Sequence, residues 1–336
     1  MTHPLPHRRR AWLLGVLVPV LVTAAAWVVA ARLVPRLPEE VAVHWGPSGV
    51  PDRTGSVAEL VVPMAVISGL SLLVMAAFSV LTGRQAITRR LTLGLAVGMS
   101  ALFAGMTLAS VVVQVDVATA ADAGSPDGWL VVSILVALAL GTTAGALAGA
   151  DPALPATGTV AEGAPTADLP EGHRAVWVRG VAGLGTTVTW VVVAAGVVAA
   201  VALWLLADTL LPLVVAVPLL ALVLTMTTWQ VQVDARGLTA RGTFGWPRIH
   251  VPAGEVERAD VTTVRPFAEF GGWGLRTSVG GTVGVVIRSG EAIAVERSGG
   301  RRIVVTVDDA ASAAGLLNTY AARARHHTSA RDATSD

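Results

Sequence analysis

The sequence predicts an α-helical membrane protein with six transmembrane helices and a C-terminal cytoplasmic β-rich domain closed by one helix. Two observations lead to this fold class. Hydrophobic residues make up 53% of the 336-residue chain and charged residues only 14%, whereas a soluble domain carries about 25% charge. After Trp229 the long apolar runs give way to short segments in which apolar and polar residues alternate, a pattern typical of half-buried strands.

Six apolar runs are long enough to cross a bilayer, which takes about 20 residues. They cover Ala11 to Val34, Ala58 to Thr82, Leu91 to Val115, Trp129 to Ala150, Val181 to Ala207 and Thr209 to Trp229. In the sequence, none of them has a charged residue near its middle. Asp208 alone separates the last two runs, so we expect a tight helical hairpin in which Pro212 and Pro218 bend the second helix.

The arginines predict the orientation, because cytoplasmic loops carry an excess of basic residues. They cluster before the first run, between the second and third, and between the fourth and fifth, at Arg8, Arg9, Arg10, Arg84, Arg89, Arg90, Arg174 and Arg179. The alternate loops hold fewer arginines and more acids. We therefore expect both termini to be cytoplasmic. The first run is longer than the roughly 7–15 residues of a signal-peptide core, so we expect it to be retained.

The chain divides into six expected segments. They are a cytoplasmic N-terminal tail (1–10), a four-helix membrane domain (11–150) with an extracellular loop (35–57), a flexible cytoplasmic linker (151–180), a transmembrane hairpin (181–229), a cytoplasmic β-rich domain (230–324) and a disordered tail (325–336). The linker is rich in Pro, Ala, Gly and Thr with scattered acids, a composition that cannot bury a core.

The β-rich domain is expected to have seven short strands separated by Gly- and Pro-containing turns. They cover Trp229 to Asp234, Leu238 to Phe244, Arg248 to Val251, Val256 to Val264, Val283 to Arg288, Ala292 to Glu296 and Arg302 to Val307. Asp308 or Asp309 can cap a final helix. Five residues on one face of this helix are expected to pack on the strands, namely Ala313, Leu316, Leu317, Tyr320 and Ala321.

The extracellular loop has the most specific pattern in the chain. Proline and acidic residues end the first helix. A short strand then ends at His44-Trp45 and enters a turn. We take this stretch as a candidate ligand-binding or conformational loop, formed by Pro38, His44, Trp45, Gly49, Pro51 and Asp52.

This loop resembles that of the SdpI-type family of bacterial membrane proteins, in a domain of otherwise unknown function. The matching residues are Leu37-Pro38, Val41, Val43, His44-Trp45, Gly49 and Pro51-Asp52, within about residues 11–80. Gly46 stands where many relatives have Asn. The resemblance implies a multipass protein of the bacterial plasma membrane. Its best-known member type gives immunity against a secreted toxic peptide and takes part in signalling through a membrane-bound repressor, but the later helices show no clear match to the immunity type.

The C-terminal segment resembles, more weakly, the bacterial PH-like domains that follow a pair of membrane helices. The features that carry this resemblance are the helical hairpin, the strand count, Trp246-Pro247 with Ile249, the Val256 segment and the run from Gly271 to Arg276. Such domains mostly act as interaction or assembly modules, which implies a protein partner here. The run Gly271 to Gly274 lacks the Lys and the Ser or Thr of a phosphate loop, and we interpret it as a loop or bulge between strands.

Three patterns have two interpretations each. His44, Asp52, Glu39 and Glu40 could bind a metal, but their spacing is not diagnostic and a structured turn with surface acids is favoured. Glycines spaced by four let helices approach closely, either within the bundle or between two copies, at Gly94, Gly98, Gly141, Gly145 and Gly149. Six arginines could face anionic lipid, although interspersed acids favour an ordinary solvated surface, at Arg236, Arg241, Arg248, Arg258, Arg265 and Arg276.

The sequence contains no enzyme motif, and we expect no catalytic residue, cofactor or metal. It has no Cys, which excludes a catalytic thiol and a disulfide. A net charge of +1 gives no reason to expect nucleic acid. The favoured function is sensing, signalling or envelope protection, in which the outer loop meets a ligand or extracellular peptide and the inner domain meets a protein partner.

Two other functions stay open. One is a transporter or channel for a small neutral or peptide substrate, for which uncharged polar residues such as Gln114 leave a path. The other is a membrane scaffold that acts through the PH-like domain. The sequence predicts no oligomeric state.

Overall fold

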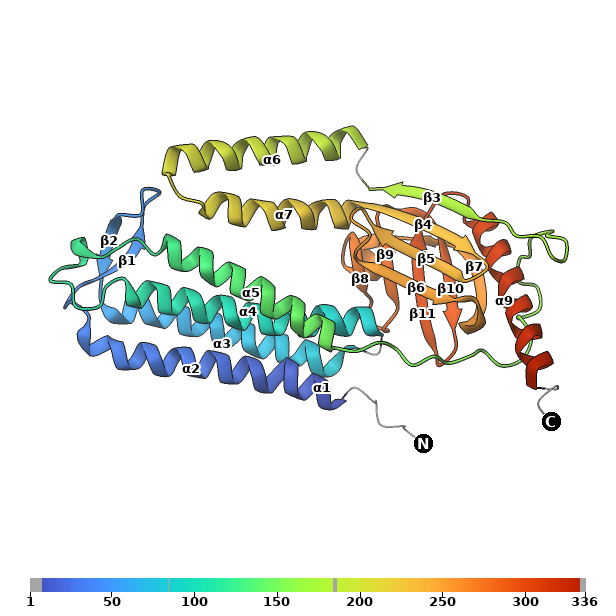
Figure 1. Cartoon of the computed structure of the whole chain (residues 1–336), viewed down its shortest axis with the longest axis horizontal. Helices are drawn as coiled ribbons and strands as arrows, with labels where there is room; N and C mark the ends of the chain where they lie inside the picture. Colours follow the sequence, from blue (N-terminus) through green and yellow to red (C-terminus); the bar gives the residue numbers. More distant parts are fainter. Residues whose placement is uncertain (1–7, 84, 184–185, 333–336) are drawn as a thin grey trace. The chain divides into compact units, whose positions relative to one another are not determined.

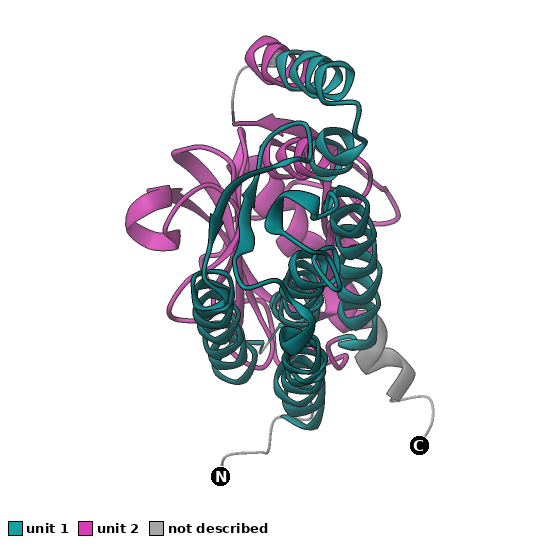
Figure 2. Ribbon diagram, turned by 90° about the vertical axis from the view of Figure 1, so that its left-hand side faces the viewer, with its two compact units in different colours: residues 1–150, 195–218 teal, residues 151–194, 219–336 magenta. Residues whose placement is uncertain are grey.

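The computed structural model describes residues 8–83, 85–183 and 186–332. Residues 1–7 of the N-terminal tail, Arg84, residues 184–185 of the predicted fifth span and the last four residues lie outside it. The chain forms two compact units (Figure 2). Unit 1 comprises Met1–Ala150 and Ala195–Pro218, and unit 2 comprises Asp151–Ala194 and Leu219–Asp336. Two apolar helices, α6 (Thr186–Ala207) and α7 (Leu211–Thr227), cross the boundary between these units.

The first apolar helix runs from Arg8 to Arg36 with changes in its helical type. In chain order it consists of α1 (Arg8–Trp12), a π turn (Leu13–Leu17), α2 (Val18–Leu33) and a 3₁₀ turn (Val34–Arg36). The π turn precedes Pro19, which has no amide proton and crowds the carbonyl four residues earlier, and the wider turn relieves this crowding.

Helix α4 lies at the centre of unit 1. It contacts α2, α3 and α5, and Figure 1 shows these helices side by side. The remaining helices of this unit are α3 (Val57–Leu81), α4 (Ala86–Val112) and α5 (Asp127–Leu147). A short 3₁₀ helix (Ala120–Asp122) lies in the α4–α5 loop.

Glycines allow the backbones of α4 and α5 to meet. A Cβ added at Gly94 would lie 2.8 Å from the carbonyl oxygen of Gly141, and one added at Gly145 would lie 3.1 Å from the carbonyl oxygen of Arg90. Gly98 is similarly close to Ala137 and Gly141. The structure thus brings four of the five candidate packing glycines together within one chain. Gly149 differs, because it follows α5 and has a left-handed φ of +87°.

Within the described residues, five helices are long and apolar enough to cross a membrane: Arg8–Arg36, Val57–Leu81, Ala86–Val112, Asp127–Leu147 and Thr187–Ala207. The sixth predicted span is the shorter apolar helix α7, Leu211–Thr227. Both ends of the predicted hairpin (181–229) therefore need correction. Val181 belongs to a strand that precedes α6, and Trp229 belongs to a strand that follows α7, because these two residues pair with each other in a sheet.

Unit 2 contains two sheets, and all seven expected strands are present, some with shifted ends. The first sheet has the order β3-β4-β5-β6, with β3 (Trp177–Ala182), β4 (Thr228–Asp234), β5 (Gly237–Gly242) and β6 (Arg248–Pro252). The second has the order β7-β10-β11-β9-β8, with β7 (Val256–Val264), β8 (Gly274–Thr277), β9 (Val283–Val286), β10 (Gly290–Arg297) and β11 (Arg301–Thr306). Short helical turns occupy Ala253–Glu255 and α8 (Pro266–Phe270).

Strands β3 and β8 were not expected from the sequence. The β3 segment was assigned partly to the linker and partly to a membrane helix. Gly274, assigned to a loop or bulge, instead begins β8, which pairs with β9.

Helix α9 (Ala310–Asp332) packs against strands of both sheets. The five residues predicted to face the strands are all buried. The tail predicted to be disordered from Arg325 instead continues this helix to Asp332. The Arg325 guanidinium donates to the carbonyl oxygen of Gly158 at 3.2 Å, a contact that a disordered tail would lack.

The segment predicted to be a flexible linker follows the surface of unit 2, and we call residues 151–176 the strap. Its backbone is hydrogen-bonded along its length. The amide of Ala156 donates to Gly254 at 2.7 Å, the carbonyl of Pro165 accepts from Asn318 at 2.8 Å, and the amide of Ala175 donates to the Tyr320 hydroxyl at 2.7 Å. These bonds involve the main chain of the strap, so its amino-acid composition does not predict them.

Asn318 also covers an exposed strand edge. β7 is the edge strand of its sheet, and Asn318 exchanges two hydrogen bonds of 2.8 Å with the backbone of Ala259 in β7. One fully buried amide thus satisfies both the strand edge and the strap. Unpaired edge groups would otherwise be available to other chains.

Substituting Gly94 with alanine tests the α4–α5 contact. The added Cβ meets a backbone carbonyl that cannot rotate away, so we expect a loss of about 1–3 kcal/mol in stability. The matched control is Gly69→Ala on α3, where a Cβ meets nothing within 4 Å. Alanine favours a helix more than glycine does, so this change should not lower stability. The measurement is the thermal midpoint of the detergent-solubilised chain. Equal midpoints for the two variants would contradict the close contact.

Substituting Asn318 with alanine tests how the strap is held. It leaves a buried amide and two carbonyls without partners, and we expect a loss of about 2–4 kcal/mol. Limited proteolysis should then cut the strap faster. Ala311→Ser, an exposed change on the same helix, is the control. A strap as resistant in Asn318→Ala as in this control would show that Asn318 does not hold it.

Candidate functional site

The predicted extracellular loop folds into a β-hairpin, in which β1 (Val41–Trp45) pairs antiparallel with β2 (Pro51–Gly55). The turn between them is closed by hydrogen bonds from the Gly46 amide to the carbonyl of Val50 and from the Gly49 amide to the carbonyl of Gly46, both 2.9 Å. Gly49 has a φ of +73°, and a Cβ there would lie 2.5 Å from the Ser125 hydroxyl. Glycine is therefore required at this position for both conformation and space.

Gln114, just beyond α4, fastens the hairpin to the helical bundle. It is fully buried. Its amide oxygen accepts from the Ala42 amide at 2.6 Å, and its amide nitrogen donates to the carbonyls of Ala42 at 3.0 Å and Ser110 at 2.8 Å. Both polar groups of the side chain thus bind backbone, which gives no support for a substrate path at this residue.

The hairpin also rests on an apolar cluster at the helix ends. Val41 is buried together with Ala30 of α2, Leu60 of α3 and Val111 of α4. On the other side of β1, Ala42 packs with Ala120 and Ala123 of the α4–α5 loop. Because both faces of β1 are covered, the hairpin moves only if the helix ends or this loop move with it.

The candidate residues of the hairpin lie in two groups. His44 and Asp52 face each other across the strands, with Nδ1 of His44 2.6 Å from a carboxylate oxygen of Asp52, and both are exposed. Trp45 instead points to the α4–α5 loop, where its indole N–H donates to the carbonyl of Gly124 at 3.0 Å. Pro38 precedes β1, and Pro51 is the first residue of β2, where it pairs with Trp45.

An ion pair links the start of the loop to the end of α4. Nε of Arg36 donates to the Asp116 carboxylate at 3.0 Å, and the Asp116 amide donates to the Arg36 carbonyl at 3.0 Å. The hydrogen bond from the Arg36 guanidinium lowers the pKa of Asp116 below its usual value. This pair is exposed, so it orients the loop more than it stabilises it.

The metal interpretation receives no support from the geometry. Among the described residues, no three His, Asp or Glu side chains come close enough to hold an ion. Glu40 lies beside Thr54, whose hydroxyl donates to its carboxylate at 3.4 Å.

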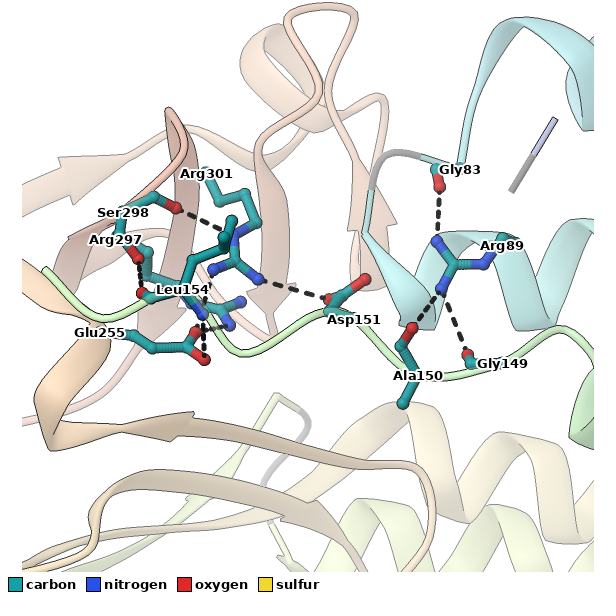
Figure 3. Close-up of polar contacts among 10 residues, drawn as sticks. All are labelled: Gly83, Arg89, Gly149, Ala150, Asp151, Leu154, Glu255, Arg297, Ser298 and Arg301. Atoms are coloured by element: carbon teal, nitrogen blue, oxygen red, sulfur yellow. Dashed lines mark hydrogen bonds and ion pairs between the residues drawn. The ribbon is translucent and has the colours of Figure 1, made fainter. Parts of the chain in front are cut away.

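At the opposite end of α4, Arg89 binds carbonyl groups of the residues that follow α5 (Figure 3). Its guanidinium donates to Ala148 at 2.9 Å, Gly149 at 3.2 Å and Ala150 at 3.1 Å, and also to Gly83 at 2.9 Å. Arg89 is only 2% exposed. A buried cation is favourable here because the end of a helix leaves its last carbonyls unpaired and carries a partial negative charge.

In unit 2, a buried ionic cluster holds the beginning of the strap (Figure 3). One carboxylate oxygen of Glu255 accepts from Arg297 at 2.7 Å and from Arg301 at 3.0 Å. The other accepts from the amide of Leu154 at 3.4 Å. The Arg301 guanidinium also lies 4.0 Å from the Asp151 carboxylate. All three side chains of the cluster are more than 90% buried, so each charge depends on its partners.

Sequence reasoning identified the hairpin residues but missed those that hold the hairpin and the strap. Arg89 was counted only as one of the basic residues that predict orientation. Gln114 gave a signal, because it is an isolated amide at the end of an apolar run. Glu255 and Arg301 gave none, because each lies near other charged residues in the sequence, Glu255 at the end of a helical turn and Arg301 at the start of β11.

Comparison with protein families matches the segment that contains the hairpin. Residues 21–68 match a family described as a domain of unknown function, DUF1648. The matched segment contains the hairpin and parts of α2 and α3, which is the region whose pattern resembles the SdpI-type family. Searches of curated proteins and of solved structures found no match.

Substituting Gln114 with glutamate tests the attachment of the hairpin. The change keeps the shape but replaces the amide donor with oxygen, so buried carbonyls lose their partner at a cost of about 1–3 kcal/mol. We expect trypsin to cut after the exposed Arg53 roughly ten-fold faster, which corresponds to about 1.4 kcal/mol. Thr142→Val is the control, because Thr142 is exposed and its hydroxyl bonds to its own helix. Equal cutting in both variants would contradict the attachment.

Proposed function

We propose that this chain is a non-enzymatic protein of the bacterial plasma membrane that carries a conformational signal from an extracellular hairpin to a cytoplasmic PH-like domain. The hairpin would meet an extracellular ligand or peptide, and the inner domain would meet a protein partner. The SdpI-type resemblance is consistent with sensing or envelope protection.

One observation carries this proposal: a buried side chain at each end of α4 binds the backbone of an irregular segment. Gln114 follows its last turn and binds the hairpin backbone. Arg89, in its first turn, binds the carbonyls of Ala148 to Ala150. A helix of 27 residues is about 40 Å long, which exceeds the roughly 30 Å hydrocarbon core of a bilayer. A shift of α4 would therefore reach both surfaces.

Two groups of polar contacts hold neighbouring residues of the chain. Ala150 is held by Arg89 in unit 1. Asp151 and Leu154 are held by the Glu255–Arg301 cluster in unit 2. Ala150 and Asp151 are adjacent in sequence. A displacement of Arg89 that moved Ala150 would therefore pull directly on the strap.

The proposed topology has six crossings. The helices α6 and α7 lie between β3 and β4 in the sequence, and these two strands pair side by side over six residue pairs. Both ends of the helical hairpin must then lie on the same side of the membrane, so if α6 crosses, α7 returns. The arginine distribution favours the cytoplasm as that side.

The PH-like assignment draws on the two sheets and on α9, which packs against strands of both. Two features depart from the expected pattern. β3 joins the first sheet from before the helical hairpin, and β9 pairs with β11 in parallel. The assignment concerns the fold and not a ligand, because one fold serves many functions.

Hydrogen exchange tests the coupling without a known stimulus. We expect Gln114→Glu, in the full chain in nanodiscs, to speed amide exchange in the strap segment 151–156 as well as in the hairpin. Arg89→Gln should speed exchange in the same strap segment while leaving the hairpin protected. Thr142→Val serves as the control. A hairpin loosened by Gln114→Glu beside a strap with unchanged exchange would refute the coupling.

A further inference from the structure

Four large aromatic side chains in two segments of unit 2 are exposed, and we call them the aromatic collar. Phe244 and Trp246 lie in the β5–β6 turn, and Phe267 and Trp273 lie around α8. They are 63%, 62%, 64% and 57% exposed, respectively. Phe267 and Trp273 pack edge to face with ring centroids 4.7 Å apart. Exposed aromatic residues in such a group mark an interaction surface.

Both parts of the collar lie where α7 ends. The hydroxyl of Thr243, next to Phe244, donates to the carbonyl of Leu224 in α7 at 3.2 Å. A Cβ at Gly274, next to Trp273, would lie 3.2 Å from the sulfur of Met226 in α7. Figure 1 shows β8 and the start of β4 beside this end of α7. If α7 is a membrane helix, as the proposed topology requires, the collar lies at the depth where the chain leaves the bilayer.

The charges around the collar are mostly positive. Of the six arginines considered for a lipid-facing surface, two are paired with acids, since Arg236 lies 2.8 Å from Asp234 and Arg258 donates to Asp260 at 3.0 Å. The other four are Arg241, Arg248, Arg265 and Arg276. They bound the two stretches that hold the collar, 241–248 and 265–276, in which Glu269 is the one acid.

Two of these arginines are placed directly beside collar elements. Nε of Arg276 donates to the carbonyl of Trp273 at 2.8 Å. Arg241 pairs across the strands with Arg248 and lines a cavity of about 420 Å³. The same cavity is lined by Trp190, Leu224 and Thr243, so it joins apolar helix surface to a cation and a hydroxyl.

We propose that the collar inserts into the headgroup layer and that Arg241 in the cavity, with the arginines near the collar, binds the phosphate of an anionic phospholipid. Aromatic rings with a polar edge favour this layer, and each nearby arginine favours an anionic over a neutral surface by about 1 kcal/mol, or about five-fold. A lipid fits better than a soluble protein, because the surface is continuous with α7 and its cavity includes the apolar Trp190. The surface would fix the domain against the membrane, independently of any signal from the hairpin.

Single cysteines in the full chain test this proposal, because the natural sequence has none. Phe244→Cys and Phe267→Cys would carry a nitroxide label in vesicles of phosphatidylcholine with or without phosphatidylglycerol. The control is Ala235→Cys, an exposed turn position at the other end of β4 and β5. We expect oxygen to reach the two collar labels and a water-soluble nickel complex to be excluded from them, and the control label to be aqueous.

The contribution of charge is tested in the same system. Replacing Arg241, Arg248 and Arg276 together by glutamine should remove the preference for brominated phosphatidylglycerol over brominated phosphatidylcholine as a tryptophan quencher. Collar labels as aqueous as the control would overturn the proposal. Labels that are aqueous in vesicles but shielded in native membranes would assign the surface to a protein partner instead. An unchanged quenching preference in the arginine variant would overturn the anionic-lipid site.

Discussion

The backbone contact between α4 and α5 sets the geometry of the helical unit. Gly94, Gly98, Gly141 and Gly145 leave room for the two helices to approach until carbonyl oxygens occupy the space that side chains would need. At this distance, dispersion and weak polar contacts between backbones replace the hydrophobic effect, which gives little driving force in lipid. The contact also places Arg89 within reach of the carbonyls at the end of α5. Larger residues at these positions would separate the partners that the hairpin and the strap depend on.

Three buried side chains bind backbone where a helix ends, where a loop begins or at a strand edge. Gln114 binds the hairpin, Arg89 binds the carbonyls that follow α5, and Asn318 binds the edge of β7. In each case backbone groups without a partner in their own element meet an amide or a guanidinium. An unsatisfied polar group costs several kcal/mol in apolar surroundings, so these few residues determine which irregular segments can be buried. Glu255 also satisfies a backbone group, but through a charged side chain: its carboxylate accepts from two arginines and from a backbone amide.

Much of the secondary structure follows from local patterns in the sequence. Long apolar runs predicted the five spanning helices, and alternation predicted seven strands, because both signals depend on neighbouring residues. β3 was missed because its residues continue into an apolar helix and its partner strand lies far along the chain. The strap was missed because backbone hydrogen bonds leave no trace in composition. In the hairpin, the sequence indicated the turn and its glycine. An isolated amide such as Gln114, however, has the same local signature whether it lines a channel or binds backbone.

The pairing of β3 with β4 makes the order of synthesis matter. β3 leaves the ribosome first and has no partner for its β4-facing edge until the whole helical hairpin and then β4 have been made. The first sheet can therefore close only after α6 and α7 have been made. A hairpin that failed to insert would leave an open strand edge, which is a target for proteases and for aggregation. In the proposed topology, closure of this four-stranded sheet would therefore depend on insertion of both helices, and chains that inserted incompletely would be exposed to degradation.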